Sequence, residues 1–279
     1  MKKHTSHLIL CFAFFTIQLS VAQENLQLTP VNNYNYFSDL WDNFNSTPSS
    51  AFTLKEYANW KILTYSAITA HFIFGNDFEL HEEYIYEKEY WPAGIPKLLG
   101  KIGETYDKPG TIYATLGLAG VLYGSGKLTQ NKKIIETTNL MTQSLIISGV
   151  FTTMLKAIIG RARPYTNRGP HFYKPFNYKF NANYMSMPSG HTSSAFALMT
   201  VIAKQHDSWY VQIPAYTFAV SVAFQRIKAN KHWGSDLIIG GTLGYLIGAT
   251  IVSQSKRNNK KFSLQPIIGR NGIGFAVKF

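Results

Sequence analysis

The sequence contains almost no cysteine: Cys11 is the only one in 279 residues. Cys11 lies in an apolar segment near the N-terminus that we expect to be removed, so the mature chain can form no disulfide. It also has no thiolate ligand to offer a metal. The residues before it, Leu8-Ile9-Leu10, lack the small side chains of a lipoprotein cleavage site. Disulfide-stapled scaffolds and cysteine metal centres are therefore excluded, whereas export to a bacterial periplasm remains compatible.

Acidic residues are scarce, with 15 Asp and Glu against 27 Lys and Arg and a formal net charge of +12. An excess of positive charge favours anionic substrates and anionic surfaces, including the surface of a membrane. No basic stripe interleaved with aromatic residues occurs, which argues against nucleic acid as a partner. We therefore expect a small anionic substrate or an anionic surface as the partner, and not nucleic acid. The sequence does not indicate an oligomeric state.

The N-terminus has an apolar stretch, but a short one. Met1-Lys2-Lys3 is a basic start, Leu8 to Leu19 is mostly apolar, and Ser20-Val21-Ala22 provides small residues at a cleavage site. The stretch is shorter than the roughly 20 residues that a spanning helix needs. We predict that residues 1–22 are a signal peptide cleaved after Ala22, the alternative being an uncleaved membrane anchor. The expected location is the bacterial cell envelope, in the periplasm and associated with a membrane.

Three segments that differ in composition precede the uncharged stretches of the chain. Residues 23–53 are rich in Asn, Ser and aromatics without a sustained period, which predicts a loosely ordered lead-in. Leu54 to Phe74 is predicted as a first helix, and Asp77 to Trp91, dense in Glu and Tyr, as a solvated surface helix. His81 beside Glu82-Glu83 could hold a metal, but no second ligand group follows at a useful spacing. We predict neither a metal nor a cofactor.

Long uncharged stretches rich in Ala, Gly, Leu, Ile and Thr dominate the rest of the chain. Strand-like alternation is absent, which predicts helices. We therefore expect an all-α helical bundle over residues 54–255, with a catalytic core at about 100–255. The five helices expected in this core are Pro109–Gly126, Thr137–Leu155, Thr192–Ala203, Trp209–Gln225 and Leu237–Ser255.

Glycines recur within the expected helices, where they would let neighbouring helices approach closely. These are Gly117, Gly120, Gly124, Gly240, Gly241, Gly244 and Gly248. The uncharged stretches lie at or just below the length that spans a membrane, and they contain many polar residues. A buried helical core and a membrane bundle therefore fit about equally well.

The last residues, 256–279, are predicted to be a basic linker followed by a short β-hairpin. Two apolar segments flank Arg270-Asn271, and Asn271-Gly272 is a strong hairpin turn signal. Two strands cannot close a barrel, so we expect the hairpin to pack on the bundle.

Lys156 and Arg163 form the first of three clusters that point to phosphate. They are seven residues apart, which places both side chains on one face of a helix. Pro164 is expected to end that helix and leave Arg163 at its terminus. Two cations at one helix end suit a phosphate dianion, and the Arg fork can hold two of its oxygens. The pair alone is weak, because basic residues are common near helix ends.

Pro188-Ser189-Gly190-His191 is the second cluster, just before an uncharged helical stretch. The first N–H groups of a helix lack partners and bind anions. Gly190 lets a phosphate approach the backbone, Ser189 adds a hydroxyl donor, and His191 lies on the first turn beside it. When the tetrapeptide is taken alone, an ordinary Ser cap with an exposed His explains it better than a phosphate site does.

Arg226, His232 and Asp236 form the third cluster. Ser235 can cap the helix that follows, so His232 is expected just before that helix and Asp236 on its first turn. A carboxylate that accepts a hydrogen bond from one ring nitrogen fixes the tautomer, and the other nitrogen keeps a lone pair. Such an imidazole is a directed nucleophile.

Together the clusters resemble the type 2 phosphatidic acid phosphatase family, which shares a core with class A bacterial acid phosphatases and vanadium haloperoxidases. The family pattern is Lys, six residues, Arg-Pro; then Pro-Ser-Gly-His; then Ser-Arg, five residues, His, three residues, Asp. Here Lys156 to Pro164, Pro188 to His191, and Arg226 with His232 and Asp236 match it. Gln225 stands where the family usually has Ser. The resemblance covers roughly residues 100–255.

The resemblance implies hydrolysis of a phosphomonoester or pyrophosphate through a phosphohistidine, without a metal. His232 would attack phosphorus, His191 would protonate the leaving oxygen and Asp236 would orient His232. The phosphate oxygens would be held by Lys156, Arg163, Ser189, Gly190 and Arg226. The substrate would be a small phosphate ester or a phosphorylated lipid such as a phosphatidate, an isoprenyl pyrophosphate or lipid A, with the aromatic loop Tyr165–Met187 either contacting the lipid or simply packing. The alternatives are a vanadate-dependent haloperoxidase and a non-catalytic envelope protein.

Overall fold

A computed structural model describes residues 36–51, 57–86, 95–108, 111–206 and 208–259, together with the backbone of two strands near the C-terminus. The predicted signal peptide, residues 1–22, lies outside the described residues. In the described part before the strands, every long element is a helix, so the all-α fold class is confirmed there. The helices are α2 (Tyr36–Ala51), α3 (Tyr57–Gly75), α4 (Asp77–Tyr86), α5 (Ile95–Asp107), α6 (Thr111–Leu128), α7 (Lys132–Ile159), α8 (Gly190–Gln205), α9 (Trp209–Lys228) and α10 (Gly234–Asn259).

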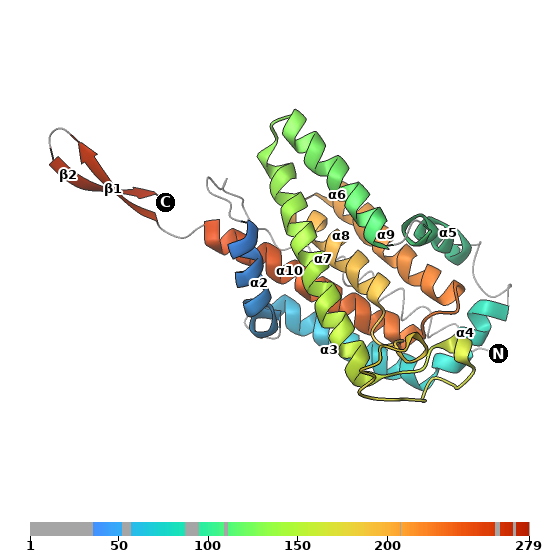
Figure 1. Ribbon diagram of the computed structural model, residues 1–279. Coiled ribbons are helices and arrows are strands. Elements are labelled where there is room, and N and C mark those ends of the chain that lie inside the picture. The colour runs from blue at the N-terminus through green and yellow to red at the C-terminus, as the bar shows by residue number, and fades with distance from the viewer. Residues whose placement is uncertain are drawn as a thin grey trace.

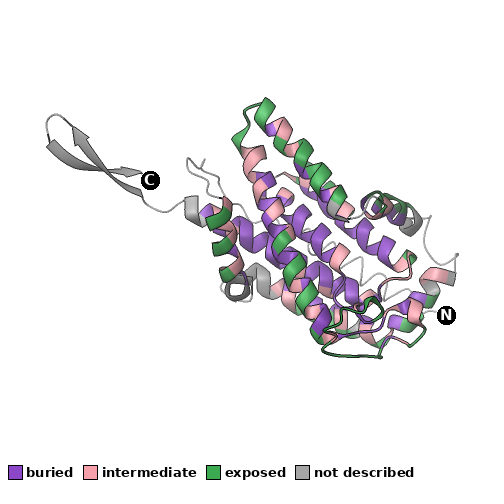
Figure 2. Cartoon of the chain, viewed as in Figure 1, coloured by how far each residue is buried: buried purple, intermediate pink, exposed green. Residues whose placement is uncertain are grey.

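The five helices expected in the catalytic core are all present, as α6 to α10. Their uncharged stretches are long enough for several turns, and each is bounded by polar or turn-forming residues. α8 packs against α7, α9 and α10, while α5 lies on α9 and α6 on α7 (Figure 1). α8, α9 and α10 are mostly buried, as Figure 2 shows, so the centre of the bundle lies among them.

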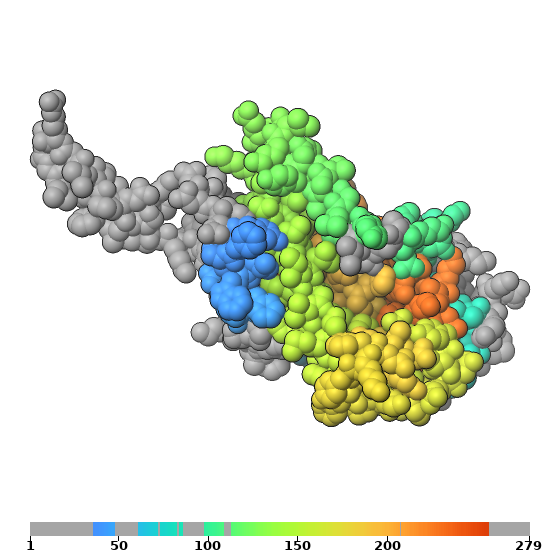
Figure 3. Space-filling view, viewed as in Figure 1, coloured from blue at the N-terminus to red at the C-terminus, as the bar shows by residue number. Residues whose placement is uncertain are grey.

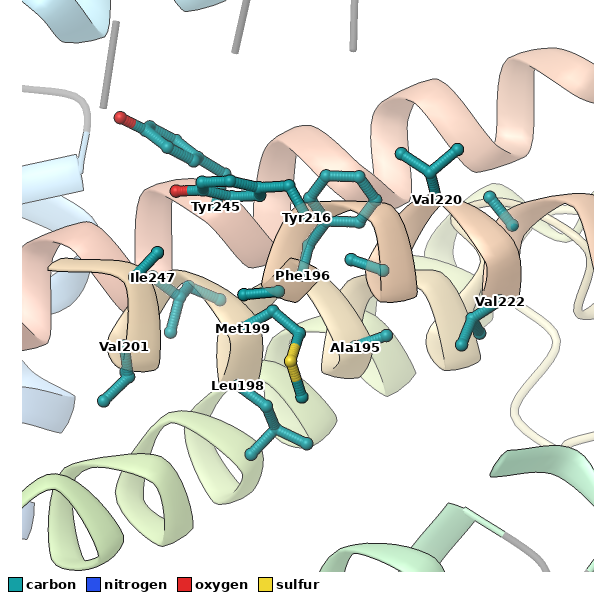
Figure 4. Packing of buried hydrophobic residues seen from close by; sticks show 14 of the residues in the cluster. Ala195, Phe196, Leu198, Met199, Val201, Tyr216, Val220, Val222, Tyr245 and Ile247 are labelled. Carbon is teal, nitrogen blue, oxygen red and sulfur yellow. The ribbon is translucent and has the colours of Figure 1, made fainter. Parts of the chain in front are cut away.

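Aromatic rings fill the space between these three central helices (Figure 4). Tyr216 of α9 lies 6.5 Å, between ring centroids, from both Phe196 of α8 and Tyr245 of α10. All three side chains are almost completely buried. Burial of such large apolar surfaces is the main favourable term in folding. The packed rings join the helices that carry His191, Arg226 and Asp236.

Three glycines of α10 allow it to approach α8 as expected. A Cβ at Gly240 would lie 2.6 Å from the carbonyl oxygen of Ser189, and one at Gly248 would lie 2.6 Å from that of Ala197. Gly244, between them, is the tightest of the three. The same expectation is wrong for Gly117, Gly120 and Gly124, which have no heavy atom within 4 Å of an added Cβ. Those glycines lie on a part of α6 that no described helix covers.

Replacing Gly244 with alanine is expected to lower the free energy of unfolding by about 2–3 kcal/mol, because overpacking a tight contact forces backbone shifts. The new Cβ would lie 2.0 Å from the carbonyl oxygen of Ser193, which is backbone and cannot swing away. Gly117→Ala is the matched control and should stabilise α6 by up to ~1 kcal/mol. Thermal unfolding of the two variants measures the contrast, and equal effects would contradict this packing.

The lead-in expected to be loosely ordered contains a helix, α2, and this part of the prediction is wrong. α2 packs on α7 and α10. Its Phe44 ring stacks on Phe151 of α7 at 5.9 Å, and the Asn43 amide donates to Gln143 at 2.6 Å. The sequence of this segment does not predict the helix, because the contacts that stabilise it are made with residues about a hundred positions away in the chain.

Two antiparallel strands follow α10 in the chain, β1 (Ser263–Gly269) and β2 (Gly272–Lys278), with Ser263 opposite Lys278. The side chains of both strands and the turn between them lie outside the described residues. The hairpin packed on the bundle therefore stays a prediction.

Candidate active site

The loop after α7 begins earlier than the sequence suggested. α7 ends at Ile159, and Gly160 follows in the left-handed conformation, with φ 62° and its N–H donating to Lys156 O at 3.0 Å. A Cβ at Gly160 would lie 1.8 Å from the carbonyl oxygen of Lys174. Glycine is therefore required both by the left-handed backbone conformation and by the lack of space for a side chain. The expected helical face shared by Lys156 and Arg163 is therefore wrong. Arg163 instead lies on the loop, where its N–H donates to Asn183 O at 2.9 Å.

Lys156 reaches the turn that opens α8. Its Nζ donates to the carbonyl oxygens of Met185 and Ser186, at 2.7 and 3.2 Å, which leaves one of three protons for another acceptor. Its Cε lies 3.6 Å from the position of a Cβ at Gly190. Burial, and then the positive charge of Arg163, lower the pKa of Lys156 to about 7. The first two sequence clusters therefore meet in space.

The turn at Ser189 is docked against the third cluster. α8 begins at Gly190 with Ser189 as its cap, as the sequence predicts. The Ser189 N–H donates to the carbonyl oxygen of Asp236 at 3.0 Å, and its hydroxyl accepts from Thr192 at 3.0 Å. Gly240 permits this close docking. The first N–H groups of α8 and the first turn of α10 consequently lie side by side.

His232 and Asp236 lie close together at the start of α10, but the hydrogen bond expected between them is not formed. Asp236 lies on the first turn, and its Oδ2 is 3.7 Å from His232 Nδ1, an ion-pair contact longer than a hydrogen bond. The same Oδ2 accepts from Trp233 N at 2.9 Å and from the Ser186 hydroxyl. Burial lowers the pKa of His232 well below its usual value, so the ring is neutral and keeps a lone pair.

Arg161 is a functional candidate that the sequence reasoning missed, because it lies off the helical face of Lys156 and Arg163. Its guanidinium is fully buried between two carboxylates: Nη1 donates to Asp236 Oδ1 and Nη2 to Asp77 Oδ2, both at 2.7 Å. Nε donates to Pro170 O at 2.7 Å. Burial alone would raise the pKa of Asp236, but Arg161, with His232 and Ser186 adding to its effect, more than offsets the burial, and the pKa lies well below its usual value. Arg161 thus keeps Asp236 ionised and in place.

The prediction that α4 is a solvated surface helix is wrong on one of its faces. Asp77 and His81 are buried, while Glu82 is exposed as expected. Asp77 Oδ1 accepts from the Ser235 N–H at 2.9 Å, so it supplies an acceptor to the N-terminus of α10. The His81 ring packs on Trp233 at 5.1 Å, and its Nε2 lies 2.8 Å from the side-chain oxygen of Asn230.

Removing the Arg161 charge is expected to destabilise the protein strongly. Arg161→Met would leave the carboxylates of Asp77 and Asp236 buried without a cation, and breaking a buried pair costs about 3–5 kcal/mol. Arg168→Met is the matched control: Arg168 is an exposed Arg of the same loop, 4.9 Å from the Phe172 ring, and its loss should cost less than ~1 kcal/mol. Chemical denaturation of both variants measures the difference. Equal midpoints would contradict a structural role for the Arg161 pairs.

Arg226 meets a carboxylate that the sequence did not reveal. Arg226 lies in the last turn of α9, and its Nη1 donates to Asp107 Oδ1 at the end of α5. His191 Nε2 lies 3.1 Å from the same oxygen, and Gln225 Nε2 donates to Asp107 Oδ2 at 2.8 Å. Burial, and then the positive charge of Arg226, lower the pKa of His191 to about 4.

The cations at the site exceed the carboxylates that face them. Arg161 is balanced by Asp77 and Asp236, and Arg226 pairs with Asp107. Among the described side chains, neither Lys156 nor Arg163 has a carboxylate in ion-pair contact. The Nε atoms of Arg163 and Arg226 are buried and have no hydrogen-bond partner among the described residues. Unpaired buried donors are costly unless an anion accepts from them. The arrangement can bind a phosphate beside two histidines. Among the described side chains, no group of three or more His, Cys, Asp and Glu could hold a metal.

Comparison with known proteins shows what the part of the chain that carries these residues is similar to. Residues 138–260 match the model of the PAP2 superfamily. The chain is 41% identical over 66 residues to the lipid A 1-phosphatase of Porphyromonas gingivalis, covering 23% of this chain and 15% of the relative. It is 26% identical over 164 residues to the lipid A 1-phosphatase of Rhizobium etli, covering 53% and 68%.

A further relative comes from a fungus. Over 164 residues the chain is 25% identical to a Schizosaccharomyces pombe protein named "Probable diacylglycerol pyrophosphate phosphatase 1", covering 48% of this chain and 59% of the relative. The chain thus spans 15% of the length of the Porphyromonas gingivalis protein and 59% of the length of the Schizosaccharomyces pombe protein. No solved structure matches the chain, so the likeness of its bundle to acid phosphatases and haloperoxidases stays a prediction. Residues 138–260 are therefore similar to the PAP2 superfamily, and the relatives that the chain matches are named as lipid phosphatases.

Proposed function

We propose that this protein is a phosphatase that hydrolyses the phosphomonoester or pyrophosphate of a lipid. One observation carries the proposal: the half-buried His191 and the buried His232 lie near the same basic side chains, Lys156 and Arg163, and Arg226 beside them is the one that pairs with a carboxylate, Asp107. A phosphate dianion supplies the missing negative charge. Its three non-bridging oxygens would accept from Lys156, Arg163 and Arg226, and from the first N–H groups of α8.

The histidines divide the reaction between them. His232, neutral and backed by Asp236, attacks phosphorus, and the bond from phosphorus to the leaving oxygen breaks as the new bond from phosphorus to nitrogen forms. His191 gives its proton to the leaving oxygen. Water then attacks the phosphohistidine, His191 takes the water proton, and inorganic phosphate leaves with His232 restored. The cations hold the oxygens throughout, as charge shifts from phosphorus to the leaving group.

A lipid is the favoured substrate for two reasons. The relatives are named as phosphatases of lipid A and of diacylglycerol pyrophosphate. The loop between α7 and α8, yellow in Figure 3, also carries aromatic side chains outward: Phe176 is 59% exposed and Tyr178 73% exposed. Exposed rings of this kind fit a membrane interface. Tyr184, expected among them, is instead buried.

The helices add a reason to place the protein at a membrane. α7 and the segment Gly234–Lys256 of α10 are long and apolar enough to cross one, although most of the α10 segment is buried in the bundle. On α7 the exposed apolar residues recur at every fourth position, and they form one face: Ile146, Val150, Met154 and Ile158. Such a face fits contact with lipid. We propose membrane association in the bacterial envelope.

A substrate panel tests the proposal. The purified full chain is assayed for phosphate release from phosphatidate, diacylglycerol pyrophosphate and lipid A in detergent micelles, and from glycerol phosphate in solution. We expect faster release from at least one lipid than from glycerol phosphate. Equal rates on soluble and lipid substrates would overturn the lipid assignment. No release from any of them, together with halide oxidation once vanadate and peroxide are added, would overturn the phosphatase itself.

A further inference from the structure

The end of α5 brings a carboxylate into the proposed active site from outside the segment that matches the family. α5 packs on α9, and Gly103 makes the contact possible: a Cβ there would lie 2.3 Å from Ser221 O and 2.8 Å from Gln225 Cβ. Asp107 lies one helical turn after Gly103, on the same face of α5. The close packing therefore aims Asp107 at the last turn of α9 and at the site.

Three donors surround the Asp107 carboxylate. Oδ1 faces Arg226 Nη1 and His191 Nε2, the latter at 3.1 Å, and Oδ2 accepts from Gln225 Nε2 at 2.8 Å. The side chain is 28% exposed, so it reaches solvent while it contacts the side chains of the site. With both oxygens engaged, the carboxylate has a fixed orientation. The glutamine that stands where the family usually has Ser is therefore the residue that holds Asp107.

We propose that Asp107 is the positioning carboxylate of His191, as Asp236 is that of His232. This inference rests on the proposed phosphatase function and adds a residue to it. Burial, Arg226, Lys156 and Arg163 hold the pKa of His191 at about 4, and a bound phosphate dianion would offset those three positive charges. A His191 ring that is then doubly protonated can donate one N–H to Asp107 and keep the other for the leaving oxygen. Asp107 also engages Nη1 of Arg226 and leaves its buried Nε for the phosphate. Each histidine of the site then has its own carboxylate.

The charges around His191 explain why a carboxylate is needed there. Arg226 faces it from α9, Lys156 from α7 and Arg163 from the loop after α7, and all three oppose a positive charge on the ring. Burial opposes it as well. Asp107, from α5, is the carboxylate that acts in the opposite direction. Without it, His191 would be protonated less readily and would serve the leaving group less well.

The test compares two leaving groups in one variant. Asp107→Asn keeps the size of the side chain and removes its charge. Glu104→Gln is the matched control, since Glu104 lies on the same helix and pairs with the partly exposed Lys228 and the exposed Lys108. For Asp107→Asn we expect kcat/KM to fall about 10–100-fold on an alkyl phosphate, which needs a protonated leaving oxygen, and less than about 5-fold on 4-nitrophenyl phosphate. Glu104→Gln should change neither substrate.

The pH profile gives a second measurement. A general acid must be protonated to work, so loss of the Asp107 charge should move the alkaline limb of kcat on the alkyl phosphate to lower pH. Rates are normalised to the folded fraction found by thermal unfolding. Equal losses on both substrates, an unchanged alkaline limb, or full activity in Asp107→Asn would each overturn the inference while leaving the proposed function intact. A wild-type protein inactive on both substrates would overturn the proposed function, and this inference with it.

Discussion

Replacing His232 with alanine is expected to reduce phosphate release by at least ~10⁴-fold, to near the background of the assay. The reason is that His232 is the only group proposed to form a bond to phosphorus, and loss of a nucleophile costs more than loss of any supporting contact. Its neutral, buried ring beside Asp236 is suited to that attack. Steady-state phosphate release from a lipid substrate measures the loss.

His206→Ala is the matched control for this experiment. His206 caps the C-terminal end of α8, whereas His191 lies on the first turn of the same helix. The control removes a histidine of the same bundle without touching the site, so it should retain activity close to that of the wild type. If His232→Ala kept more than about a tenth of the wild-type rate while folding normally, another residue would have to be the nucleophile.

Replacing His191 with alanine is expected to slow alkyl phosphate hydrolysis by about 10²–10⁴-fold, the usual contribution of a general acid. His191 would supply the proton that an alkoxide leaving group needs as its bond to phosphorus breaks. An aryl leaving group is a far weaker base and departs without help. The loss on 4-nitrophenyl phosphate should therefore be much smaller, and the ratio of the two rates is the quantity to measure.

The two-substrate design separates chemistry from structure in the His191 variant. A folding defect or a misplaced phosphate would lower both rates together, because both substrates use the same cations. Equal losses would therefore argue that His191 only helps to bind phosphate. A change in KM without a change in kcat would point the same way.

Much of the site could be predicted from the sequence because its residues lie in short motifs. Ser189, Gly190 and His191 are consecutive, and His232 and Asp236 are one helical turn apart, so local geometry brings each group together. The helices that carry them have uncharged stretches long enough to be recognised. The family match over residues 138–260 covers all of these motifs.

What the sequence did not reveal depends on contacts between distant segments. On a continuous helix Arg161 would point away from Lys156, but α7 ends at Ile159, and beyond it the chain turns Arg161 toward Asp77, 84 residues away. In the same manner, Asp107 accepts hydrogen bonds from Gln225 and Arg226, which are 118 and 119 residues away in the chain. No local period encodes such pairs. From the sequence alone, an acidic residue on a helix is predicted to be exposed to solvent, and only the fold shows that Asp77 and Asp107 contact buried partners.

Asp77 and Asp107 bring carboxylates to the site from outside the segment that matches the family model. Asp77 on α4 and Asp107 on α5 both precede residue 138, where the family match begins. One is tied to Asp236 through Arg161, and the other contacts His191 directly. The N-terminal helices therefore complete the electrostatics of the site in addition to covering the bundle.

The most direct test of the account is to trap the phosphorylated enzyme. Wild-type protein is mixed with 4-nitrophenyl phosphate, quenched in alkali, where phosphohistidine is stable, and analysed by peptide mass spectrometry. His191→Ala, in which hydrolysis of the intermediate is expected to be slowed, should accumulate more of it. The account predicts a phosphoryl group on His232. Recovery of the phosphoryl group on His191 in the wild type, or on any residue other than His232, would contradict it.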